Sequence, residues 1–113
     1  MSLELRRVIL FTSNIAALAE FYETVVGLTV ATRDDGWVDL EAGACGLALH
    51  AGKPKIGNRP PKIVFYASDV AQMRALLIKR GLTQAGPVKS AGRFELCDCR
   101  DPDGNPFQIS SRT

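Results

Sequence analysis

The chain has 113 residues, of which 46% are hydrophobic and 23% charged, and its formal net charge at pH 7 is +2. These proportions are those of an ordinary globular protein, and a chain of this length can fold as one domain that buries roughly 65% of its unfolded surface. The excess of Lys and Arg is too small and too scattered for a nucleic-acid-binding surface. No apolar run approaches the roughly 18 residues that span a bilayer, so we expect neither nucleic acid nor a membrane as a partner.

The cysteines indicate a reducing compartment. Cys45, Cys97 and Cys99 are an odd number, and the N-terminal residues do not read as a signal peptide. We therefore expect free thiols in a cytoplasmic protein. Cys97 and Cys99 share one face of a predicted strand, but they lack the second cluster that a metal site would need.

The first half of the chain predicts one helix and four strands. Residues 4–12 are rich in Val, Ile, Leu and Phe, which is typical of a buried strand. Ser13 and Asn14 then offer an N-cap, and apolar residues at helical spacing continue to Gly27, which can end the helix in the left-handed conformation. Three short strands are predicted after the helix, at about 28–33, 36–41 and 46–51.

The second half repeats this order after a linker. Residues 52–61 hold three prolines and two glycines, a composition typical of a connecting segment. Asp69, with Gln72 three residues on, resembles a capping box, and Gly81 can end the second helix. Further strands are predicted at about 83–85, 92–100 and 106–111, the last two joined by a turn at 101–105 whose residues each favour a turn.

The repeat can be read directly from the residues. Residues 7–15 are echoed by 62–70, and both helical segments end in Gly-Leu-Thr. A further match, of 36–40 with 92–96, keeps nearly the same offset. The duplication therefore covers most of each half.

This order predicts an α+β fold of two tandem βαβββ modules in a single domain, 1–113, with module one at 4–51 and module two at 62–111. Two such modules side by side would make a curved eight-stranded mixed sheet, with the helices on one side and a concave cleft on the other. Period-two alternation indicates which side chains face that cleft. The expected cleft residues are Arg7, Phe11, Trp37, Asp39, His50, Lys62, Tyr66, Arg93, Glu95 and Gln108.

Several local patterns occur together and in order. Phe21-Tyr22 is followed by Val26-Gly27-Leu28, the strand-to-helix junctions at 13–14 and 68–69 match, and 101–105 precedes the last strand. This combination resembles the vicinal oxygen chelate superfamily, which includes glyoxalase I, bleomycin resistance proteins, extradiol dioxygenases and fosfomycin resistance enzymes. The resemblance implies a glyoxalase-like fold and a homodimer. It also implies that metal-using members place their ligands on the first and last strands of each half.

Those positions carry the wrong chemistry for a divalent cation. Arg7 and Lys62 stand on the first strands, and both are cations without a free lone pair. The last strands offer Gln108 in one half and Ala48 in the other, with His50 one pleat further along. One imidazole and one carboxamide do not make a metal site, so we expect no catalytic metal and no cofactor.

The cations have two interpretations. Arg7 and Lys62 should be symmetry-related, and two cations in one cleft are costly unless negative charge joins them. Asp39 and Glu95 could neutralise them internally. Alternatively, the cations hold an anionic or carbonyl-bearing ligand, for which the fork of an arginine is suited.

The remaining cleft residues also have two interpretations each. His50 is either hydrogen-bonded to a neighbouring strand or acts as a ligand donor or general base. The rings of Phe11, Trp37 and Tyr66 either belong to the core or form walls for a flat, partly apolar ligand.

Three functions follow from these alternatives. The first is a metal-independent protein that binds a small anionic or neutral aromatic or carbonyl ligand. The second is a metal-dependent lyase, epimerase or dioxygenase of the same superfamily, and the third is an interaction module whose cleft is closed by its own side chains.

Overall fold

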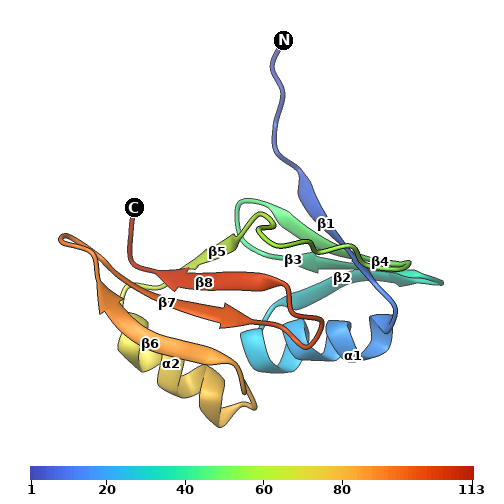
Figure 1. Cartoon of the computed structure of the whole chain (residues 1–113). Helices are drawn as coiled ribbons and strands as arrows, with labels where there is room; N and C mark the ends of the chain where they lie inside the picture. The colour runs from blue at the N-terminus through green and yellow to red at the C-terminus, as the bar shows by residue number, and fades with distance from the viewer. The chain divides into compact units, whose positions relative to one another are not determined.

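The computed structural model describes all residues of the chain, 1–113. They form two compact units, Met1–Lys55 and Ile56–Thr113, and the boundary falls within the proline-rich segment 52–61. Each unit has the predicted βαβββ order (Figure 1). The eight strands form two four-stranded mixed sheets, one in each module, so the α+β class and the two-module layout are confirmed.

Module one is built from a strand, a helix in two parts and three further strands. Its elements are β1 (Arg7–Thr12), α1 (Ile15–Glu20), η1 (Phe21–Val26), β2 (Thr29–Asp34), β3 (Trp37–Glu41) and β4 (Gly46–Ala51). The strand order is β1-β4-β3-β2, in which β1 runs parallel to β4 and the other neighbours are antiparallel. The outer strand β1 is thus the first in sequence.

The helix of module one is bounded as its sequence predicts but is wound differently. The side chain of Asn14 accepts a hydrogen bond from the Ala17 amide at 3.2 Å, which identifies Asn14 as the N-cap. Gly27 ends the helix with φ of 93°. The second half, η1, is a π-helix, in which the Gly27 amide donates to Tyr22. Apolar spacing alone does not distinguish this winding from an α-helix.

Module two has the same arrangement. Its elements are β5 (Ile63–Tyr66), α2 (Val70–Lys79), β6 (Ala85–Ser90), β7 (Glu95–Arg100) and β8 (Pro106–Ser110), in the strand order β5-β8-β7-β6. The Asp69 carboxylate caps α2 by accepting from the Gln72 amide at 3.0 Å. The parallel pair is β5 with β8.

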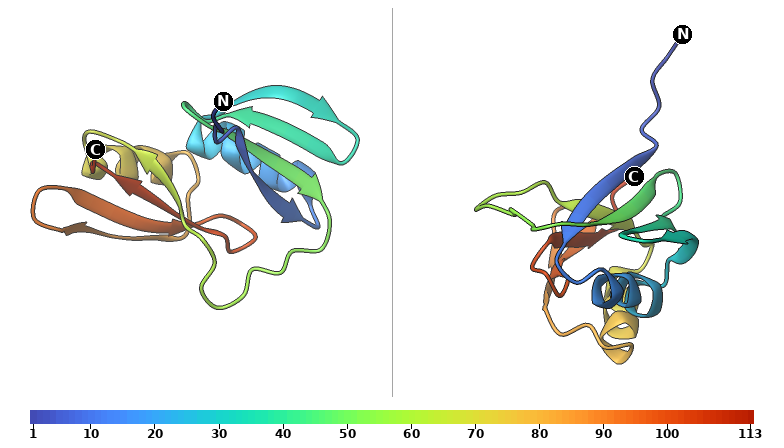
Figure 2. Two further views of the ribbon diagram at one scale, coloured as in Figure 1. Left: turned by 90° about the horizontal axis from the view of Figure 1, so that it is seen from above. Right: turned by 90° about the vertical axis from the view of Figure 1, so that its right-hand side faces the viewer.

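Each helix lies against one face of its own sheet, and the other face is left without a helix (Figures 1 and 2). The core of each module forms between helix and sheet. The largest side chains buried there belong to Leu18, Tyr22, Leu40, Leu47 and Leu49 in module one, and to Val70, Cys97, Phe107 and Ile109 in module two. Burying a leucine or isoleucine side chain stabilises a fold by about 1.5–3 kcal/mol. We call the helix-free side of each sheet its open face.

One predicted strand is misplaced. The strand expected at 83–85 runs instead over Ala85–Ser90. This strand includes Gly86 and Pro87, and its pairing with β7 shifts register between Ala85 and Val88, as at a β-bulge. An outer strand tolerates both residues at such a bulge.

The match of 36–40 with 92–96 is also wrong. Two residues join β2 to β3, whereas four join β6 to β7. In the structure, Val38 of β3 corresponds to Cys97 of β7, which pair with Arg33 and Val88 respectively. The sequence match had aligned Val38 with residue 94, three residues earlier. None of the helices combines the length and the apolar character that crossing a membrane requires.

Candidate functional site

The open face of module one carries a polar and aromatic cluster. Alternation places Arg7 and Phe11 of β1 on this face, and β4 brings His50 opposite both Phe11 and Trp37. Asp39 lies on the same face of β3, two residues after Trp37. All five residues that the sequence predicted for this half therefore lie on one face, and they are close to one another.

Their contacts define the geometry. The Arg7 Nη2 atom lies 3.5 Å from Asp39 Oδ2, and the guanidinium carbon lies 6.0 Å from the centre of the Trp37 ring. The His50 ring meets Phe11 edge-on at 5.2 Å between centroids and Trp37 at 5.9 Å. Arg7 is thus partly neutralised within the module. An ion pair this long and this exposed contributes at most about 1 kcal/mol to stability.

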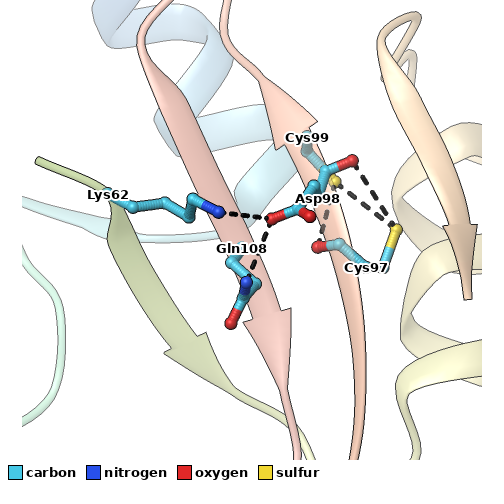
Figure 3. Close-up of polar contacts among 5 residues, drawn as sticks. All are labelled: Lys62, Cys97, Asp98, Cys99 and Gln108. Carbon is cyan, nitrogen blue, oxygen red and sulfur yellow. Dashed lines mark hydrogen bonds and ion pairs between the residues drawn. The ribbon is translucent and has the colours of Figure 1, made fainter. Parts of the chain in front are cut away.

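The open face of module two carries a second cation and carboxylate pair. Lys62 Nζ and Gln108 Nε2 both donate to Asp98 Oδ1, each at 3.0 Å (Figure 3). The pKa of Asp98 lies below its usual value, because the hydrogen bond from Gln108 and the contact with Lys62 outweigh the effect of partial burial. Asp98 therefore remains ionised at neutral pH.

Asp98 is the site residue that sequence reasoning missed. The sequence echo assigned Arg93 and Glu95 to this face, but Arg93 lies in the loop before β7. Glu95 begins β7 on the side of Cys97 and Cys99, which is the helix side. The partner of Lys62 is thus Asp98 rather than Glu95. The alternation of β7 was the available signal, because two buried cysteines that flank Asp98 turn it to the open face.

Tyr66 lies on β5 opposite Ser110 and is 61% exposed. Phe11, its counterpart in the repeat, is 49% exposed. Neither ring belongs to the core of its module. Trp37 is half-buried.

The two cysteines of β7 face the core and are not nucleophiles. Their Sγ atoms lie 3.7 Å apart without a disulfide (Figure 3). Burial, and next the neighbouring Cys97, raise the pKa of the Cys99 thiol to about 12. A thiol with such a pKa stays protonated and unreactive at neutral pH.

A recess accompanies each ion pair. In module one a recess of about 730 Å³ is lined in part by Arg7 and Asp39. In module two a recess of about 410 Å³ is lined in part by Lys62 and Asp98. We refer to these as recess one and recess two.

The residues at the ligand positions of the resembled metal sites do not fit a divalent cation. Within neither module do three His, Cys, Asp or Glu side chains lie close enough to hold one. Arg7 and Lys62 carry only hydrogen-bond donors and no free lone pair that could bind a metal ion. On the last strands, the equivalent places opposite Asp39 and Asp98 belong to Ala48 and Gln108. The side chain of Ala48 has no atom that could bind a metal ion.

Comparison with known proteins agrees with this architecture. The sequence model of a family described as "Glyoxalase-like domain" matches residues 7–110. Among solved structures, a glyoxalase/bleomycin resistance protein/dioxygenase from Nocardioides is 21% identical with a TM-score of 0.78, over 97% of this chain and 83% of that one. A lactoylglutathione lyase from Agrobacterium tumefaciens is 18% identical with a TM-score of 0.77, over 97% and 94%.

A further similar structure is an integron cassette protein from the mobile metagenome of V. cholerae. It is 27% identical with a TM-score of 0.74, over 100% of this chain and 98% of that one. No curated protein matches the chain. The similarities below 25% identity show the fold and nothing more.

Proposed function

This chain belongs to the glyoxalase-like domain family of the vicinal oxygen chelate superfamily, and we propose that it acts there without a metal, as a protein that binds a small ligand. The ligand is anionic, or a neutral aromatic or carbonyl compound. It binds on the open faces of the sheets. The proposed ligand-binding residues are Arg7, Phe11, Trp37, Asp39 and His50 in module one, and Lys62, Tyr66, Asp98 and Gln108 in module two.

The observation that carries this proposal is the matched pair of cations. Arg7 and Lys62 occupy equivalent places in the repeat, and each is held by one aspartate on its own open face. Their side chains are 40% and 45% exposed, so both can still reach a ligand. A fixed, partly solvated cation can supply the positive charge that binds a carboxylate or polarises a carbonyl group.

The exposed rings support a flat ligand. Phe11 and Tyr66 are too exposed to serve mainly as core, and Trp37 lies beside the Arg7 guanidinium. Aromatic side chains gain about 0.5–1.5 kcal/mol from a well-placed ring beyond the area that they bury. Benzoate, with one ring and one carboxylate, is therefore a suitable first probe.

Calorimetric titration with benzoate tests the proposal. We expect binding to weaken about a hundredfold or more in the double variant Arg7→Ala/Lys62→Ala, since charge-assisted hydrogen bonds contribute about 1.5–3 kcal/mol each and about 1.4 kcal/mol is tenfold in affinity. Binding of benzamide, which lacks the charge, should change less. Arg33→Ala is the matched control, because Arg33 is also an exposed, ion-paired arginine, with Glu23 at 3.9 Å.

Two results would contradict the proposal. One is unchanged benzoate and benzamide binding in the double variant. The other is a stoichiometric divalent cation in the purified protein by elemental analysis, which would favour a metal-dependent lyase, epimerase or dioxygenase.

We also propose a homodimer in the cytoplasm. The open faces expose apolar side chains such as Ile9 and Val64, which a second chain could cover. All three cysteines are free, in keeping with a reducing compartment. A monomer in light scattering at micromolar concentration would remove the dimer from this proposal.

A further inference from the structure

Recess one and recess two lie at equivalent places in the repeat. In module one, Ala48 of β4 pairs with both Asp39 and Ile9. In module two, Gln108 of β8 pairs in the same way with both Asp98 and Val64. The residues two positions further along are Glu41 at the end of β3 and Arg100 at the end of β7. Each of these also lines its own recess.

The charges of the two recesses differ in sign. The charged residues that line recess one are Glu4, Arg6, Arg7, Asp39 and Glu41, which leaves one excess negative charge. Those that line recess two are Lys62, Asp98 and Arg100, which leaves one excess positive charge. The repeat has therefore exchanged a carboxylate for a guanidinium at a single equivalent position, Glu41 against Arg100.

The turn that follows β7 holds Arg100 in place. Arg100 Nη1 donates to the Gly104 carbonyl at 2.8 Å. The buried Asp101 carboxylate closes this turn by accepting from the amides of Asp103 and Asn105 at 3.0 and 2.9 Å and from Asn105 Nδ2 at 2.8 Å. Gly104 has φ of +89°, a conformation that favours glycine. The carbonyl that positions Arg100 is thus fixed by the turn itself.

Both cations of recess two keep donors to spare. Arg100 uses one guanidinium N–H group on Gly104, and Lys62 uses one ammonium N–H group on Asp98. The Asp98 carboxylate is in turn shared by Lys62 and Gln108. An incoming oxyanion therefore meets one positive charge in excess and unused donors on two side chains.

We infer, on the basis of the proposed function, that recess two binds the anionic group of the ligand, a carboxylate or a phosphate, through Arg100 and Lys62. Recess one, with its excess of carboxylates, binds this group more weakly than recess two does. Arg100 is thereby a binding residue in addition to those named above. The ligand has its negative group at the Arg100 end of the module-two sheet.

A chemical-shift titration of the full chain tests this inference. Inorganic phosphate and acetate serve as separate probes, with methylammonium as a cation of similar size. We expect phosphate, acetate or both to shift the amides of 62, 84–86 and 98–100, and methylammonium to leave these amides unchanged. The two anions tell which oxyanion the recess prefers.

Substitutions of Arg100 and of its counterpart Glu41 complete the test. Arg100→Gln should weaken oxyanion binding about tenfold, whereas Arg100→Lys should restore part of it because the charge returns. Glu41→Gln is the matched control at the equivalent position of recess one and should leave the affinity of recess two unchanged. An amide spectrum that is otherwise native confirms that each variant is folded.

The inference is overturned if neither anion shifts the amides of recess two, or if Arg100→Gln binds both as the unsubstituted chain does. If benzoate binding is lost in Arg7→Ala/Lys62→Ala but kept in Arg100→Gln, the proposed function stands and this inference fails. If benzoate does not bind but phosphate binds in an Arg100-dependent way, the proposed function fails and recess two is an oxyanion site of its own.

Discussion

Asp98 shows how much one carboxylate oxygen can organise on an open sheet face. Its Oδ1 atom receives hydrogen bonds from both Lys62 and Gln108 at 3.0 Å. The hydrogen bond from Gln108 is the largest single cause of its lowered pKa, and Lys62 lowers it further through both a hydrogen bond and its charge. A hydrogen bond from a neutral amide can thus favour the ionised carboxylate beside a half-exposed ammonium group, whose field is screened by water.

The pKa of Asp98 should therefore respond to Gln108→Ala as well as to Lys62→Ala. Removing either donor takes away a contact that favours the ionised form, so both substitutions should raise the pKa toward the usual value. Titration of the carboxyl carbon by NMR measures this shift directly. An unchanged pKa of Asp98 in Gln108→Ala would contradict the role assigned to this hydrogen bond.

The same contacts make stability depend on pH in a known direction. Because the folded pKa of Asp98 is lowered, its contribution is fully present above the unfolded value near 3.8 and is lost as the pH falls through the folded value. Asp98→Asn should reduce the free energy of unfolding at pH 7 by less than about 1 kcal/mol, since the pair is half exposed. Urea unfolding at several pH values checks this, and a difference from the unsubstituted chain that grows below pH 4 would contradict it.

At the scale of single elements, the helix starts were the most predictable features. Ser13-Asn14 and Asp69 indicated them, and in the structure the side chains of Asn14 and Asp69 form the cap hydrogen bonds. The sequence could not choose between Ser13 and Asn14, since both residues cap well. That choice depends on the backbone path out of β1.

Asn14→Ala should therefore lower the free energy of unfolding by about 1 kcal/mol, as loss of an N-cap commonly does. Ser13→Ala is the matched control, because no cap hydrogen bond depends on its side chain, and it should have little effect. Chemical denaturation of both variants provides the measurement. Equal losses would show that the cap is shared between the two residues.

The hairpins were less predictable, because the repeat does not preserve loop length. The turn of Asp34–Trp37 is tight, whereas the connection from Ser90 to Glu95 is two residues longer. Aligning Gly36 with Gly92 therefore turned the wrong side chains of β7 toward the open face. A register error of an odd number of residues exchanges the two faces of a strand, and this is why Asp98 was missed.

At the scale of the whole molecule, the repeat predicted the modules and the order of helix and strands along each one, because each must bury one sheet face under one helix. The composition of the open faces followed from alternation wherever the register was right, as it was for Arg7, Phe11 and His50. The balance of charge in each recess did not follow, because it depends on which side chains meet across β3 or β7 and the turn after it. Arg100 entered the site only once the register of β7 was known.

The two modules can be followed separately during unfolding with reporters that the chain already contains. Trp37, the single tryptophan, reports on module one, and the buried thiols of Cys97 and Cys99 report on module two. Cys45 is half exposed and should react with a thiol reagent under native conditions, whereas the other two should wait for unfolding. The fast and slow phases of labelling can therefore be assigned.

We expect the urea midpoint from Trp37 fluorescence to coincide with that from protection of Cys97 and Cys99. Each module has only some fifty residues, and a unit of that size buries too little surface to be more than marginally stable by itself. The duplicated halves should then unfold as one cooperative system. The variant Cys45→Ala is the control, because the slow thiol phase that remains in it must belong to module two. Two separated midpoints would show instead that each βαβββ module is stable independently.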